Sequence, residues 1–197
     1  MLFIFKMKKR VIIVHGWDGN PDLGWMNWLR KALESKDFEV KSPEMPDKSN
    51  PKIGPWIKRL SETIGKADEN TILIGHSIGC QTILRYLEGL PKKIQIGGAI
   101  FVAGWFSLIN LETEQEKEIA KSWIESRIDF DKVKTHANKF VAILSDDDPW
   151  VDLRENKKIF EEELNAKVII EHKKGHINES DNDKLPSVLN SLNEMVK

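Results

Sequence analysis

A serine stands at the centre of the pentapeptide Gly75-His76-Ser77-Ile78-Gly79. The apolar run before it reads as a buried strand, and the residues from Ser77 onward read as a helix. A serine at a sharp strand-to-helix turn projects its hydroxyl from the end of a sheet. The spacing G-x-S-x-G keeps side-chain bulk away from that turn. The pattern is typical of a serine nucleophile and indicates acyl transfer through Ser77.

A serine nucleophile needs a base, and the base needs a carboxylate that orients it. Both are expected in loops just past strands, where the carboxyl ends of parallel strands meet. His176 follows the last predicted strand and comes directly after a glycine, so it is the expected base. Another strand is followed by Asp146, Asp147 and Asp148. Position favours Asp148, because the next residue is a proline that biases it toward a turn. The other two read as solvated loop carboxylates, and position alone leaves the choice open.

The same edge of the sheet should supply the amides that bind an oxyanion. We expect them to be those of Ile78, at the helix start, and Trp17, in the loop 15–20. This loop has neither of the glycine spacings typical of nucleotide sites, so no cofactor is expected. Four aromatic residues at predicted strand ends are candidate walls of an acyl pocket: Trp17, Trp105, Phe106 and Trp150. For each residue taken alone, packing at the rim of the sheet is the favoured role.

The remaining histidines and the cysteine suggest no other chemistry. His172 and His176 lie four residues apart, but their loop context argues against a helical metal-binding pair, and no metal is expected. His76 is expected to buttress the turn around the serine, and His136 to lie on the surface. Cys80 comes one turn into the helix and reads as a small buried residue.

These groups need a scaffold that brings several strand ends together. Six apolar runs of strand length alternate with helical patterns along the chain. The predicted strands are 11–14, 38–41, 71–74, 98–102, 140–144 and 167–171, and the predicted helices are 22–36, 54–67, 77–90, 112–124, 152–164 and 183–196. This alternation predicts a parallel sheet covered on both faces, a three-layer α/β/α sandwich in the α/β class, with 11–14 and 71–74 as neighbouring central strands.

The length of 197 residues suits one domain, 1–197, and no composition shift marks a second. The segment 105–139 lacks a strand and has two readings, a small cap over the strand ends or an ordinary crossover. The apolar part of the N-terminus is too short to span a membrane, and basic residues follow it, opposite to a secretory signal. Residues 1–7 are a candidate disordered tail, and Met7 is an alternative start.

Composition narrows the classes of partner. Lys and Arg total 30, Asp and Glu total 31, and the net charge is −1, so no global field would draw the chain to nucleic acid or to an acidic membrane. A single cysteine excludes an internal disulfide and suits the reducing cytoplasm. The expected partner is a small-molecule acyl substrate, and the sequence does not indicate an oligomeric state.

With these motifs in place, the chain resembles the compact α/β hydrolases related to retinoblastoma-binding protein 9 and the bacterial YdeN proteins. The matching segments are spread over nearly the whole chain: 11–16, the Trp-x-x-Trp segment 24–29, the Met-Pro-Asp segment 45–47, 75–79, 145–149 and 175–176. The resemblance implies a compact α/β-hydrolase fold with a six-stranded sheet, a small or absent cap, no cofactor, and ester or small-amide substrates. It also implies Ser77 as nucleophile, Asp148 as acid and His176 as base.

A second class of function is a non-catalytic interaction module on a hydrolase fold, since fold alone does not determine function. Binding requires only a surface, whereas catalysis requires three side chains and two amides to converge. The sequence offers a candidate for each of these parts, and this favours the enzyme.

Overall fold

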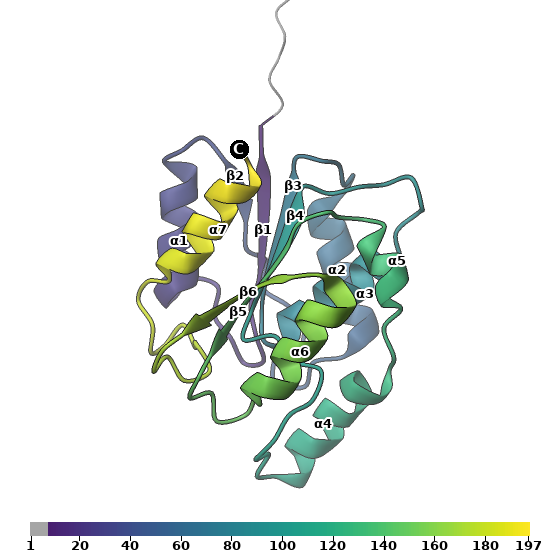
Figure 1. Ribbon diagram of the computed structural model, residues 1–197, viewed down its shortest axis with the longest axis vertical. Coiled ribbons are helices and arrows are strands. Elements are labelled where there is room, and N and C mark those ends of the chain that lie inside the picture. Colours follow the sequence, from purple (N-terminus) through teal and green to yellow (C-terminus); the bar gives the residue numbers. More distant parts are fainter. Residues whose placement is uncertain (1–7) are drawn as a thin grey trace, which may run out of the picture.

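Six parallel strands form a single sheet in the computed structural model, which describes residues 8–197 (Figure 1). The expected tail 1–7 and the alternative start at Met7 lie outside the described residues. The strand order is β2-β1-β3-β4-β5-β6. The strands are β1 (Arg10–Val14), β2 (Glu39–Lys41), β3 (Thr71–His76), β4 (Gly98–Val102), β5 (Phe140–Ser145) and β6 (Lys167–Glu171). The predicted α/β class and six-stranded parallel sheet are confirmed.

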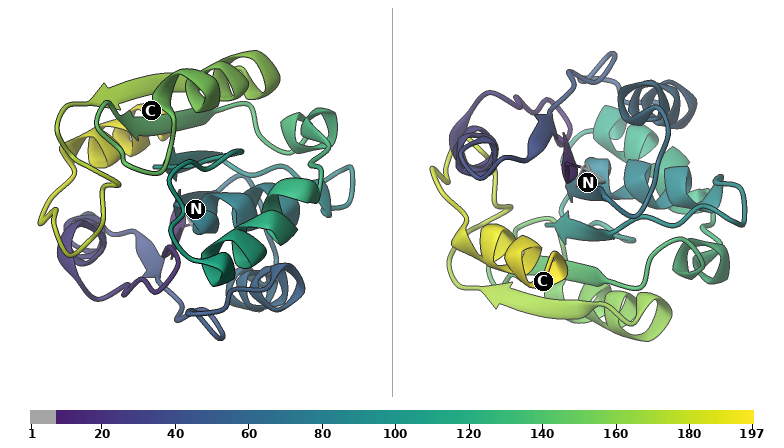
Figure 2. Two further views of the ribbon diagram at one scale, coloured as in Figure 1. Left: turned by 90° about the horizontal axis from the view of Figure 1, so that it is seen from below. Right: turned by 90° about the horizontal axis from the view of Figure 1, so that it is seen from above.

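Helices cover both faces of the sheet (Figures 1 and 2). One face carries α1 (Gly24–Glu34) and α7 (Pro186–Met195), and the other carries α2 (Ile53–Ile64), α3 (Ile78–Glu88), α5 (Phe130–Lys134) and α6 (Leu153–Leu164). Because successive side chains of a strand point to opposite faces, Ile12 packs with the second group and Ile13 with the first. The result is the predicted three-layer sandwich. Within residues 8–197, no helix combines the length and apolar character that crossing a membrane requires.

Strands β1 and β3 are neighbours at the centre of the sheet, as predicted. Their register pairs Arg10 with Thr71 at one end and Val14 with Gly75 at the other. The loops that follow these two strands therefore emerge side by side. Loops after β4, β5 and β6 leave the same edge of the sheet, because all strands run in one direction.

The segment 105–139 contains two helices. The expected one, α4 (Glu114–Glu125), lies at the end of the molecule where the strands finish (Figure 1). It begins with a reciprocal capping box, in which Thr113 and Glu116 each accept a hydrogen bond from the other's backbone amide. The short helix α5 was not predicted. It begins where the side chain of Asp129 accepts from the Lys132 amide, and five residues are too few to show a helical period.

The turn between β3 and α3 packs backbone against backbone. Ser77 has φ 51° and ψ −119°, a strained conformation for a residue with a side chain. A Cβ at Gly75 would lie 2.7 Å from the Cys80 nitrogen, and one at Gly79 would lie 2.4 Å from the Val14 carbonyl oxygen. The glycines of the pentapeptide are thus required by close approach between elements.

We expect Gly79→Ala to lower the free energy of unfolding by about 1–3 kcal/mol or more, because main-chain atoms cannot move aside cheaply. The matched control is Gly54→Ala in α2, where an added Cβ would meet nothing within 4 Å. Alanine there should instead raise the free energy of unfolding by about 0.5 kcal/mol through helix propensity. Urea denaturation measures both changes, and similar values for the two variants would contradict the packing argument.

Candidate active site

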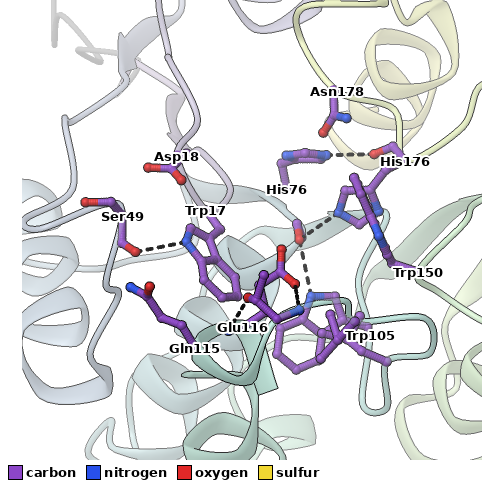
Figure 3. A pocket seen from close by; sticks show the side chains of 14 residues that line it. Trp17, Asp18, Ser49, His76, Trp105, Gln115, Glu116, Trp150, His176 and Asn178 are labelled. Atoms are coloured by element: carbon purple, nitrogen blue, oxygen red, sulfur yellow. Dashed lines mark hydrogen bonds between the residues drawn. The ribbon is translucent and has the colours of Figure 1, made fainter. Parts of the chain in front are cut away.

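Three side chains from three loops form one hydrogen-bonded chain. The Ser77 Oγ lies 2.8 Å from His176 Nε2 (Figure 3). His176 Nδ1 in turn lies 2.7 Å from Asp148 Oδ2. This arrangement requires the tautomer in which Nδ1–H donates to the carboxylate and Nε2 accepts from the serine hydroxyl. The side chains of His176 and Asp148 are only 7% and 2% exposed. The structure therefore brings together all three residues expected to carry the chemistry.

The carboxylate of Asp148 is held from its other side by backbone amides. Its Oδ1 accepts from the amides of Trp150, at 3.0 Å, and Val151, at 3.1 Å. The intervening Pro149 has no N–H to offer, so the turn folds the next two amides back onto the carboxylate. Asp148 therefore presents Oδ2 to the histidine in a fixed direction.

The two preceding aspartates do more than the solvated role expected for them. Asp146 accepts from the ring of His172, at 2.6 Å, and from the Lys173 amide, at 2.9 Å. Asp147 accepts from the Gly175 amide, at 2.8 Å. Each of the three adjacent aspartates thus contacts a successive part of the loop that ends in the histidine. Asp146 and Asp147 are exposed to solvent, as expected, but they also anchor this loop.

The histidine loop is anchored from its buried side as well. His76 Nε2 lies 2.9 Å from the carbonyl oxygen of His176, and the indole N–H of Trp25 donates to the Ile177 carbonyl at 2.9 Å. Ile177 has φ 53°, an unfavourable conformation for a β-branched residue. His76 therefore supports the proposed base, in addition to lying in the serine turn where it was expected to act. Trp25 belongs to the Trp-x-x-Trp segment, whose role the sequence did not reveal.

A further histidine, His15, supports the loop after β1. Its Nε2 accepts from the Met45 amide at 2.9 Å, and its Nδ1 lies 2.7 Å from the Gly16 carbonyl oxygen. These contacts require the neutral ring, and burial lowers the pKa of His15 accordingly. The Trp56 indole N–H holds the same Met-Pro-Asp segment by donating to the Pro46 carbonyl at 2.8 Å. No role was predicted for His15, although the Met-Pro-Asp segment that it contacts is part of the family resemblance.

The serine opens into a cavity of about 520 Å³. Three of the four expected aromatic walls line it, namely Trp17, Trp105 and Trp150 (Figure 3). Residues of the segment 105–139 line it as well: Leu108, Leu111, Thr113, Gln115 and Glu116. The fourth expected wall, Phe106, is not among the lining residues. Its ring packs at a tilt against that of Phe160, with centroids 4.9 Å apart, and lines a second cavity of about 340 Å³.

Two backbone amides beside the serine have no hydrogen-bond acceptor within residues 8–197. They are those of Trp17 and Ile78, the pair expected to bind an oxyanion. Ile78 is the first residue of α3, and amides in the first turn of a helix have no intrahelical acceptor. Trp17 follows Gly16, where a Cβ would lie only 2.6 Å from His76 Nδ1. Glycine thus permits this loop to approach the serine turn.

The other groups considered in the sequence lie apart from the serine or are inert. His136 was expected on the surface, but it is 2% exposed and its Nδ1 lies 2.7 Å from the Ile94 carbonyl oxygen. Cys80 is fully packed, and burial raises the pKa of its thiol. In the part of the chain that the structure describes, no cluster of three or more histidine, cysteine or acidic side chains could hold a metal ion.

Comparison with known proteins shows the family of the chain. The family model described as "Serine hydrolase" matches residues 11–194. The chain belongs to the serine hydrolase family. It is 32% identical to YdeN of Bacillus subtilis (strain 168) over 78% of both chains. It is 28% identical to serine hydrolase RBBP9 of Rattus norvegicus, over 93% of this chain and 95% of that protein. The crystal structure of the B. subtilis ydeN gene product superposes with a TM-score of 0.87, 28% identity, and coverage of 96% and 99% of the two chains.

Because His76 is buried, the free energy of unfolding should depend on pH. Burial, reinforced by the neighbouring His176, lowers the pKa of His76 from 6.5 to about 4. Between these values the unfolded chain binds a proton at this site that the folded chain does not. The free energy of unfolding should therefore fall as the pH is lowered from 6.5 to 4, by about 3 kcal/mol at full extent.

The variant His76→Gln keeps an N–H donor for the His176 carbonyl but cannot titrate. We expect its free energy of unfolding to fall less than that of the wild type between pH 7 and pH 4.5, by about 2 kcal/mol. Urea denaturation at both pH values measures the difference. His172→Gln is the control, because His172 is exposed and its pKa is raised by the hydrogen bond to Asp146. An unchanged pH dependence in His76→Gln would refute the assignment.

Proposed function

We propose that this serine hydrolase cleaves small acyl esters or amides with Ser77 as nucleophile, His176 as general base and Asp148 as the orienting acid. The observation that carries the proposal is the unbroken hydrogen-bond chain from Ser77 Oγ through His176 to Asp148, with distances of 2.8 and 2.7 Å. This is the geometry in which a neutral imidazole can take the serine proton while a buried carboxylate stabilises the resulting imidazolium.

In the proposed reaction, Ser77 Oγ attacks the acyl carbonyl carbon as its proton passes to His176 Nε2. His176 then gives that proton to the leaving alcohol or amine, and an acyl-serine remains. Water repeats the sequence with the same base and releases the acid. Asp148 keeps its negative charge throughout and holds the ring in the required tautomer.

The amides of Trp17 and Ile78 are proposed to bind the oxyanion of each tetrahedral intermediate. Their lack of acceptors within the described residues supports this role, since a substrate oxygen would satisfy both. The Ile78 amide also lies at the positive end of α3, an 11-residue helix. Losing one such donor typically costs about 10²–10³ in rate.

The volume and the lining of the cavity favour a small acyl substrate. Its volume of about 520 Å³ lies within the usual range for small-molecule sites, and Trp17, Trp105 and Trp150 give it apolar walls. Five residues between 108 and 116 form part of its lining, so we propose that the segment 105–139 acts as a small cap as well as a crossover. The single, unpaired Cys80 favours a reducing, cytoplasmic setting.

Labelling with a fluorophosphonate probe tests the nucleophile. The wild type should become labelled at Ser77, and Ser77→Ala should not, because the probe forms a covalent bond with an activated serine hydroxyl. Peptide mapping of the labelled protein identifies the site. Labelling of both proteins alike would place the nucleophile elsewhere. A folded wild type that resists the probe and turns over no ester would favour the interaction module.

Substitution of each aspartate by asparagine tests the acid. We expect Asp148→Asn to lower the turnover of a p-nitrophenyl ester by about 10⁴-fold, because a carboxamide favours the wrong histidine tautomer. Asp146→Asn and Asp147→Asn are the matched controls, since they alter adjacent carboxylates that contact the loop but not the His176 ring. These two should lose far less activity. A larger loss at Asp147 than at Asp148 would overturn the assignment.

A further inference from the structure

The nucleophilic oxygen has a second hydrogen-bond partner besides the histidine. The indole N–H of Trp105 donates to Ser77 Oγ at 3.2 Å, in addition to the contact with His176 Nε2 at 2.8 Å (Figure 3). The serine hydroxyl gives its hydrogen to His176 and accepts from Trp105 with one lone pair, and its other lone pair remains free for attack. Trp105 thus touches the reacting atom itself.

This contact distinguishes Trp105 from the other tryptophans with an indole hydrogen bond in the described residues. Those of Trp17, Trp25, Trp56 and Trp123 all donate to backbone carbonyls. A wall residue has no need to direct its N–H at a nucleophile. The surroundings of Trp105 also hold the indole in this orientation.

The backbone of Trp105 is fixed by a buried polar network. Its carbonyl accepts from the Gln81 side chain, whose oxygen in turn accepts from the Arg85 guanidinium. Arg85 also donates to the carbonyls of Trp123 and Ser126, each at 2.6 Å. Just before Trp105, a Cβ at Gly104 would lie 2.8 Å from the Phe160 ring. With Trp105 itself 2% exposed, the indole has little freedom to turn away from Ser77.

A donor to Oγ affects the two halves of the reaction differently. In the acyl-enzyme, Oγ is an ester oxygen whose lone pair is delocalised into the carbonyl, so it accepts a hydrogen bond poorly. When water adds to the carbonyl carbon, that delocalisation ends and Oγ becomes a good acceptor. In acylation, by contrast, Oγ begins as a hydroxyl that already accepts well. A hydrogen bond that stabilises the reactant and the transition state equally does not accelerate the step.

We propose that the Trp105 indole N–H is a catalytic hydrogen-bond donor to Ser77 Oγ that acts mainly in deacylation; this rests on the function proposed above. Water adds to the acyl carbon and passes one proton to His176 Nε2. The C–Oγ bond then breaks, and its electron pair returns to Oγ, which takes that proton from His176 as the carbonyl re-forms and the acid leaves. Trp105 keeps its own proton throughout and stabilises Oγ as it departs.

Stopped-flow hydrolysis of p-nitrophenyl acetate separates the two halves. In Trp105→Phe, we expect the burst of p-nitrophenol to keep its rate within about twofold, while the steady-state rate falls about tenfold, the value of one neutral hydrogen bond. Intact-mass measurement after acid quench should show more acetyl-enzyme than in the wild type. Trp123→Phe is the matched control, because it loses another buried indole N–H, on α4, and should leave the ratio of the two rates unchanged.

Replacement of Trp105 alone by β-(benzothiophen-3-yl)alanine keeps the ring shape and removes only the N–H. This second variant applies if Trp105→Phe does not fold, and it should give the same selective loss of deacylation. An equal fall in both rates, or no change in either, would overturn the role of Trp105. If the wild type shows no acetyl group on the peptide containing Ser77, the proposed nucleophile fails instead, independently of Trp105.

Discussion

The close packing of backbone on backbone at the start of α3 is the constraint on which the rest of the site depends. Ser77 has φ 51°, and the carbonyl of Val14 leaves no room for a side chain at Gly79. Strain of this kind persists only where the surroundings over-determine the conformation. Here the central strands β1 and β3 and the buried helix α3 provide that support. The serine consequently has one position, and every other group is arranged around it.

The loop that carries His176, the proposed base, is held as firmly as the turn at Ser77, but by side-chain hydrogen bonds. This loop carries no regular structure of its own, yet it is held on one side by three consecutive aspartates and on the other by His76 and Trp25. Loops usually carry function because a rigid scaffold positions them. In this protein the scaffold reaches the loop through side chains from β3, α1 and the turn after β5. Precise placement of His176 therefore does not require a strand or helix at that point.

Local patterns made much of this site predictable. Asp148 precedes a proline, His176 follows a glycine, and Ser77 lies midway between two glycines, each two residues away. The alternation of strands with helices predicted the parallel sheet. Support from distant segments was not predictable. Trp25 donates to a carbonyl 152 residues away, and the buried ring of His136 contacts a carbonyl 42 residues earlier. Trp105 and Phe106 are adjacent aromatic residues after the same strand, so the sequence does not distinguish them. Only the tertiary structure shows that Trp105 is the one that faces the serine.

The double role of Glu116 has a consequence for anyone who wishes to redirect the enzyme by directed evolution. Its carboxylate accepts from the amides of Glu112 and Thr113 to begin α4, and the same residue lines the cavity. A library randomised at this codon would thus select for helix integrity and substrate preference at once. Many variants with a useful pocket would be discarded because the helix start frays. Glutamine, which keeps the cap while removing the charge, offers the least constrained first step, and neighbouring wall positions offer freer ones.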